Sequence, residues 1–143
     1  MLDSIIDACC LINLYATDRP AEILQSCSRT FYISTQVAGE TLSIRQPDPL
    51  DPANAIAVPL DLSFEIASGQ IQQCSLSGTV EQAAYINFAT ELDDGEASCL
   101  AIARSRGWTV ATDDRKAIRI AQENGIAIVT TPELVAPTPT VTL

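Results

Sequence analysis

The chain has 143 residues, of which 47% are hydrophobic, and a formal net charge of -10. This length fits one domain with a sizeable buried core. The acidic balance excludes a protein that grips nucleic acid by its overall charge, because such proteins are basic. The sequence contains no histidine, which excludes catalytic pairs of histidine with serine or cysteine and excludes imidazole metal ligands.

The cysteines and the hydropathy pattern indicate a cytoplasmic protein. No apolar stretch approaches the roughly 20 residues that a membrane span needs. The first residues lack the basic region of a signal peptide. The five cysteines follow no metal-site spacing, so we expect free, mostly buried thiols in a reducing compartment. They are Cys9, Cys10, Cys27, Cys74 and Cys99.

The first half of the chain predicts two strands and three helices. A short apolar strand ends near Asp7 and leads into a helix of the "LINLYA" segment. A second helix covers residues 20–27, where Pro20 suits a first turn. Residues 30–34 predict a strand, and residues 35–44 predict a helix that carries Glu40. The Pro/Asp-rich residues 45–54 predict a loop.

The strongest alternation of apolar and polar residues runs from Val58 to Ile66. This period of two predicts a half-buried strand, and Ser68-Gly69 could turn it into a hairpin. Pro59 marks the strand as an edge strand, because proline cannot donate to a ladder. We therefore expect a hairpin insertion at about residues 56–77.

The second half alternates helices and strands. The pattern predicts helices over 79–92, 95–107 and 114–125, with Gly107 and Gly125 closing the last two. Strands are predicted over 108–112 and 126–131. Taken together, the order of elements predicts an α/β fold with a mainly parallel sheet.

Several acidic residues fall where strands of this sheet give way to helices. Asp7 ends the first strand, and Asp113 and Asp114 end the third; Glu40 and Glu96 lie in helices that could lean over the same edge. Ligands of such sheets collect beyond the carboxyl ends of the strands. Converging carboxylates repel one another, and a hard cation such as Mg²⁺ or Mn²⁺ relieves that repulsion.

Helix capping is the alternative interpretation of the same residues. Asp113 is placed to cap the helix that follows it, and Asp93 or Asp94 is placed to cap the helix over residues 95–107. Each such cap contributes about 1 kcal/mol to stability. Glu96 in a first turn suits the helix dipole. Asp7 is harder to explain in this way, because it stands between apolar segments and burying a lone carboxylate is costly.

Basic residues gather in the last third of the chain, close in sequence to the acidic clusters. They could be solvated helix faces and dipole partners, or they could meet nucleic-acid phosphates locally. These five of the eight basic residues are Arg104, Arg106, Arg115, Lys116 and Arg119.

Four stretches, in this order, resemble the PIN-like domains. "IIDACCLINLYA" resembles the family's opening, with its first acidic residue at Asp7, and "FYISTQVAGETL" its second strand and second acidic residue, Glu40. "LDDGEASCLAIARSRG" resembles a Leu-x-x-Gly-Glu-Ala pattern of one branch of the family and places the third at Glu96. "WTVATDDRKAIRIAQENGIAIVTTPEL" offers Asp113 or Asp114 as the fourth.

The resemblance implies a three-layer α/β/α domain over residues 1–134, with a four- to five-stranded, mainly parallel sheet, followed by a Pro-rich tail over 135–143. Many PIN-like domains are Mg²⁺- or Mn²⁺-dependent ribonucleases, including the toxins of VapBC toxin–antitoxin pairs, and many form dimers. It implies RNA, a cognate antitoxin and a second copy as partners. The catalytic residues implied are Asp7, Glu40, Glu96 and Asp113, the metal ligands Asp7, Glu96, Asp113 and Asp114, and the RNA contacts Arg115 and Lys116.

Three features depart from the family pattern. Ala8 and Cys9 stand where many members have a hydroxyl residue, the hairpin region is long, and no final helix is expected after "TTPEL". They leave open a PIN-like scaffold that binds a partner protein and does not cut RNA. A phosphoacceptor receiver domain is a third alternative, but it needs a lysine after a late strand, and the only lysine, Lys116, lies inside a predicted helix.

Overall fold

The computed structural model describes residues 2–40 and 42–136. Its centre is a five-stranded sheet in the order β5-β2-β1-β6-β7, with every neighbouring pair parallel. The strands are β1 (Leu2–Ile6), β2 (Arg29–Ser34), β5 (Ile71–Cys74), β6 (Thr109–Ala111) and β7 (Ile128–Val129). Because β1 is central, the residue that follows it lies in the middle of the sheet's carboxyl edge.

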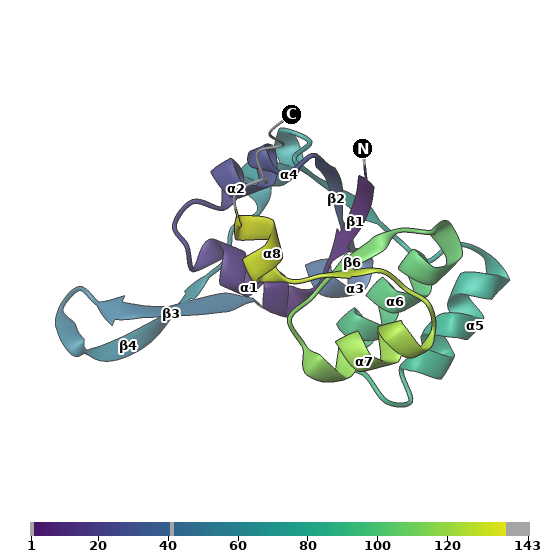
Figure 1. The fold of residues 1–143 in the computed structure, drawn as a ribbon. Helices are drawn as coiled ribbons and strands as arrows, with labels where there is room; N and C mark the ends of the chain where they lie inside the picture. The colour runs from purple at the N-terminus through teal and green to yellow at the C-terminus, as the bar shows by residue number, and fades with distance from the viewer. Residues whose placement is uncertain (1, 41, 137–143) are drawn as a thin grey trace.

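Helices cover both faces of the sheet (Figure 1). On one side lie α1 (Ala8–Tyr15), α2 (Pro20–Ser26) and α8 (Thr131–Val135), and on the other α5 (Gly78–Phe88), α6 (Asp94–Arg106) and α7 (Arg115–Glu123). The inner strands are covered on both faces, and their apolar residues Ile5, Ile6, Phe31 and Ile33 are almost completely buried. The predicted three-layer α/β/α class with a mainly parallel sheet is confirmed.

The central helix α6 packs against three strands, β1, β2 and β6. Its buried face is rich in small residues, including Ala97, Ala101 and Ala103, which let the helix approach the sheet closely. A hydroxyl pair fixes its first turns, because Ser98 Oγ lies 2.7 Å from Ser34 Oγ at the end of β2. The start of α6 is thereby held at the carboxyl edge of the sheet.

The hairpin lies in a different segment from the one predicted. Strands β3 (Ser43–Asp48) and β4 (Asp51–Pro59) pair antiparallel, so the residues predicted as a loop form most of it. An Asx turn closes the hairpin, with Leu50 N donating to Asp48 Oδ1 at 2.9 Å. The prolines that suggested a loop sit on a two-stranded ribbon, where every strand is an edge and proline is tolerated.

The alternating stretch from Val58 to Ile66 is not one strand. Asp61 Oδ1 accepts hydrogen bonds from the backbone and hydroxyl of Ser63, at 2.9 and 2.5 Å, and helix α4 (Ser63–Ala67) begins there. Phe64 is consequently 65% exposed and Glu65 is buried, the reverse of the strand prediction. Residues predicted as the second hairpin strand form β5 of the main sheet instead.

Two helix predictions also need correction. Helix α3 (Thr35–Ala38) is one short turn that ends at Gly39, so Glu40 follows the helix and is not carried by it. The "TPELV" segment itself forms a final helix, α8, started by a capping box of Thr130 and Glu133. Residues 137–143, most of the predicted Pro-rich tail, lie outside the described residues. Among the described residues, no helix is long and apolar enough to cross a membrane.

Candidate active site

Asp7 is a buried carboxylate at the centre of the sheet's carboxyl edge, with 2% of its surface exposed. One oxygen accepts from Ala8 N at 2.7 Å, which caps helix α1. The other accepts from Thr112 Oγ1 at 3.0 Å and from Cys9 Sγ at 3.5 Å. Burial raises the pKa of Asp7 above its ordinary value, and these hydrogen bonds oppose the rise. The carboxylate is therefore both capping and firmly oriented.

Cys9 and Thr112 hold the end of β6 against Asp7. The Cys9 sulfur lies 3.3 Å from Thr112 Oγ1 and accepts from Asp113 N at 3.4 Å. Burial raises the pKa of the Cys9 thiol, so it stays protonated at neutral pH and can donate. Cys9 thus donates a hydrogen bond to Asp7. It does so at the position where the sequence resemblance led us to expect a hydroxyl residue.

Glu96 lies in the first turn of α6, where the charges of three other carboxylates act on it. Asp93 caps the helix by accepting from Glu96 N at 2.8 Å. Burial and the charges of Asp93, Asp7 and Asp114 raise the pKa of Glu96 to about 8. Burial is the largest cause of this rise, and the neighbouring negative charges add to it.

Glu40 reaches the same cluster from the segment between α3 and the hairpin. Partial burial raises the pKa of Glu40, with further contributions from the charges of Asp93, Asp7 and Asp94. The glycine of the "LDDGE" stretch makes room for it, because a Cβ atom added at Gly95 would overlap Glu40 Oε1. The lack of a side chain at Gly95 therefore allows Glu40 to pack against the start of α6.

The two adjacent aspartates after β6 face different surroundings. Asp114 caps α7 by accepting from Ala117 N at 2.8 Å, and its charge acts on Glu96. Both oxygens of Asp113 are occupied elsewhere. They accept from Asn13 Nδ2 at 2.6 Å, from Thr131 N at 2.7 Å and from the Thr131 hydroxyl. The structure brings Asp114 to the cluster and ties Asp113 to α1 and α8.

The acidic cluster thus consists of Asp7, Glu40, Asp93, Glu96 and Asp114. Of these, Asp93 was considered only as a helix cap. Its charge acts on Asp7, Glu40 and Glu96, so it belongs to the cluster as well. The signal in the sequence was the pair of adjacent aspartates in "LDDGE". A helix cap requires only one of them, so the second negative charge could have pointed to an additional role.

The family is decided by comparison with known proteins. Residues 3–136 match the family model of the PIN domain. The chain belongs to the PIN domain family. A PilT N-terminus domain protein from the hyperthermophilic archaeon Sulfolobus solfataricus P2 has a similar structure, with a TM-score of 0.56 and 17% sequence identity over 94% of this chain and 91% of that chain. At this identity the likeness shows the fold alone. No curated protein matches the chain.

PIN domains are generally nucleases and generally use divalent metals. The acidic cluster fits that chemistry in its donors, which are carboxylate oxygens throughout, the ligands of hard cations. It also fits in electrostatics: burial and, after it, repulsion from neighbouring carboxylates raise the pKa values of Glu40 and Glu96, and a cation relieves that repulsion. Across residues 2–40 and 42–136, no three such side chains are already arranged around a common metal position. A metal would draw the carboxylates closer together.

Basic side chains border the cluster on the α7 side of this PIN domain. Arg115 and Lys116 directly follow Asp114 and are exposed at the start of α7. Arg106 and Arg119 are engaged with glutamates, at 2.9 and 3.3 Å. Arg115 and Lys116 are therefore the cations that stand next to the cluster in sequence and face solvent.

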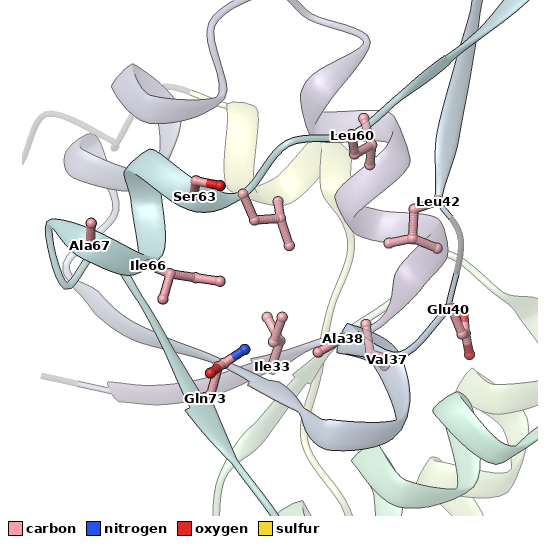
Figure 2. A pocket seen from close by; sticks show the side chains of 11 residues that line it. Ile33, Val37, Ala38, Glu40, Leu42, Leu60, Ser63, Ile66, Ala67 and Gln73 are labelled. Atoms are coloured by element: carbon pink, nitrogen blue, oxygen red, sulfur yellow. The ribbon is translucent and has the colours of Figure 1, made fainter.

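The opposite border is apolar. A cavity of about 440 Å³ lies between β2, α3, α4 and the base of the hairpin, with Glu40 at one end (Figure 2). Most of its lining is aliphatic, including Ile33, Leu42, Leu60 and Ile66.

Proposed function

We propose that this PIN domain is a metal-dependent endoribonuclease that hydrolyses RNA phosphodiesters. The observation that carries the proposal is the convergence of Asp7, Glu40, Glu96 and Asp114, from four separate segments, on the carboxyl edge of the sheet. Mg²⁺ or Mn²⁺ is the proposed cofactor, because both take carboxylate oxygens.

Each side chain has a distinct proposed role. Asp7, oriented by three donors, is the fixed ligand, and Glu40, Glu96 and Asp114 complete the set from the surrounding helices. A bound divalent cation would lower the pKa of a water molecule and stabilise charge on the phosphate. Arg115 and Lys116 would bind the flanking phosphates and position the strand. Asp113 would act indirectly, by holding α8 against α1 beside the site.

The direct test is cleavage of a mixed-sequence RNA by the metal-stripped protein. We expect internal cuts with Mg²⁺ or Mn²⁺ and none with EDTA. Cleavage that persists at full rate in EDTA would overturn metal dependence, and the absence of cleavage with either metal would overturn the nuclease proposal.

The role of Arg115 and Lys116 predicts a change in the salt dependence of RNA binding. Without metal, the double variant Arg115→Ala/Lys116→Ala should bind RNA more weakly. The slope of log affinity against log salt should fall by about 1.4, because each phosphate contact with a single strand contributes roughly 0.7. Fluorescence anisotropy over a salt series measures this. Arg104→Ala, exposed near the end of α6, is the matched control and should keep the wild-type slope.

A toxin of a toxin–antitoxin pair is the proposed biological setting, with a cytoplasmic location and a cognate antitoxin as partner. All five cysteines are free thiols, which suits a reducing compartment. Expression of the chain in a bacterial host should then arrest growth, and Asp7→Asn should restore it. Normal growth with active, soluble protein would count against a toxin.

A protein-interaction scaffold without nuclease activity is the second candidate. Two observations favour it: no three acidic or thiol side chains of the described residues stand ready around a metal, and the hairpin exposes apolar residues. This candidate predicts no cleavage and no change of melting temperature with Mn²⁺. The nuclease proposal predicts cleavage and a rise of the melting temperature with Mn²⁺.

A further inference from the structure

The β3–β4 hairpin is an arm that projects from the body of the domain (Figure 1). It approaches the body through β3, which lies near α1 and shares a surface hollow with Ala16 and Asp18. In the part of the chain that the structure describes, β4 pairs with β3 alone, and residues 51–57 are exposed. An isolated two-stranded hairpin is at best marginally stable in water, so this arm lacks the packing that normally stabilises one.

The outer edge of β4 is unusually free of charge. Residues 52–60 are nine consecutive uncharged residues in a chain whose net charge is -10, with Asp51 before them and Asp61 after. Edge strands are commonly protected by charged side chains or prolines. Here the prolines, Pro52 and Pro59, stand only at the two ends, and every second residue between them turns its backbone N–H away from β3, toward the free edge.

We propose that β4 pairs antiparallel with β4 of a second copy, across a two-fold axis at Ala55 or Ile56. The product is a four-stranded sheet in the order β3-β4-β4-β3. Each copy offers the other the same patch, as a two-fold interface requires. The inference rests on the fold alone and is independent of nuclease activity.

Charge favours a second copy as the occupant of this edge. Two chains of charge -10 repel each other over most of their surfaces, but here they would meet through strands without charge. The two prolines lie three to four residues on either side of the proposed axis, so they fall at the ends of the shared ladder. A second copy supplies a strand that matches β4 in length, in lack of charge and in the spacing of its prolines.

Pairing would also bury apolar surface that is now exposed. Ile56 is 40% exposed and lies opposite Gln46 of β3. One existing contact would have to open: Arg45 Nη2 lies 3.5 Å from the Ala55 carbonyl oxygen. That contact is long and exposed, so a backbone N–H from a second strand can replace it.

The oligomeric state and a matched pair of variants test the proposal. Light scattering after gel filtration at micromolar concentration should give a dimer mass for the wild-type chain. Ile56→Lys, which brings two charges together at the axis, should give a monomer with unchanged circular dichroism. Ile86→Lys is the control, since Ile86 is 67% exposed on α5, and it should remain a dimer. A monomeric wild type, or a dimer that survives Ile56→Lys, overturns the proposal.

Cross-linking gives a second measurement that does not depend on weakening the interface. Residues facing each other on the axis have Cα atoms about 4.5–5.5 Å apart, within disulfide range. Ala55→Cys or Ile56→Cys should therefore form an intermolecular disulfide on mild oxidation, above the background of the five native thiols. Leu50→Cys at the tip should not, because the two tips would lie roughly 35 Å apart. Equal cross-linking through Leu50→Cys would contradict the predicted pairing.

Discussion

Replacing Asp7 with asparagine is expected to reduce metal-dependent RNA cleavage by more than about 100-fold. Even the loss of an outer partner of a metal ligand costs about 10- to 100-fold, and Asp7 is proposed as a ligand itself. The variant should nevertheless fold. Asparagine keeps an oxygen for Ala8 N, and its amide group can donate to Thr112, whose hydroxyl can also accept.

The loss can be separated from misfolding by a matched control. Asp18→Asn makes the same chemical change at an exposed residue, and its left-handed backbone, with φ of 62°, suits asparagine as well as aspartate. Initial rates with Mn²⁺, together with melting curves, should show loss of activity only in Asp7→Asn. Wild-type rates in Asp7→Asn would remove this carboxylate from the proposed catalytic set.

Glu96→Gln is expected to make the metal-free protein more stable at pH 8 while reducing its stabilisation by Mn²⁺. The folded-state pKa of Glu96 is about 8 and its ordinary value is 4.5. Between these values the folded state binds more protons than the unfolded state, so stability falls as pH rises from about 4.5 to 8. Glutamine removes this loss, because it carries no charge at any pH.

The size of the effect is limited by solvent screening, because Glu96 is only partly buried. We expect about 1 kcal/mol, which corresponds to a rise in melting temperature of about 3 °C at pH 8 and little change at pH 4. With Mn²⁺ the order should reverse, since metal bound to the native state stabilises it. Glu91→Gln, an exposed glutamate before α6, should behave as wild type. An unchanged Mn²⁺ response in Glu96→Gln would exclude Glu96 as a ligand.

The sheet and most of the acidic cluster were predictable because their causes are local. The apolar runs around Ile5 and Ile33 indicate buried parallel strands, and the structure has strands there. Asp7 and Asp114 lie where a strand gives way to a helix, and this position alone places them at the carboxyl edge. Both residues cap helices and also belong to the acidic cluster, whereas Asp113, the predicted cap of α7, does not cap it.

The hairpin and the choice between Asp113 and Asp114 depend on contacts that the local pattern does not contain. Alternation around Phe64 predicted a strand, but two hydrogen bonds from Ser63 to Asp61 start a helix instead. Asp113 is held by Thr131, which lies 18 residues further along the chain. Only the folded arrangement of α8 shows that Asp113 is held by Thr131, while the charge of Asp114 acts on Glu96.

The most direct measurement is isothermal titration of Mn²⁺ into the metal-free protein at pH 7, in buffers of different ionisation enthalpy. Metal binding to a carboxyl that is largely protonated must release a proton, and the pKa of Glu96 near 8 makes it such a group. The account predicts saturable binding whose heat depends on the buffer, a dependence that Glu96→Gln abolishes. No binding heat in any buffer would contradict it and leave the acidic cluster as helix caps on a PIN scaffold.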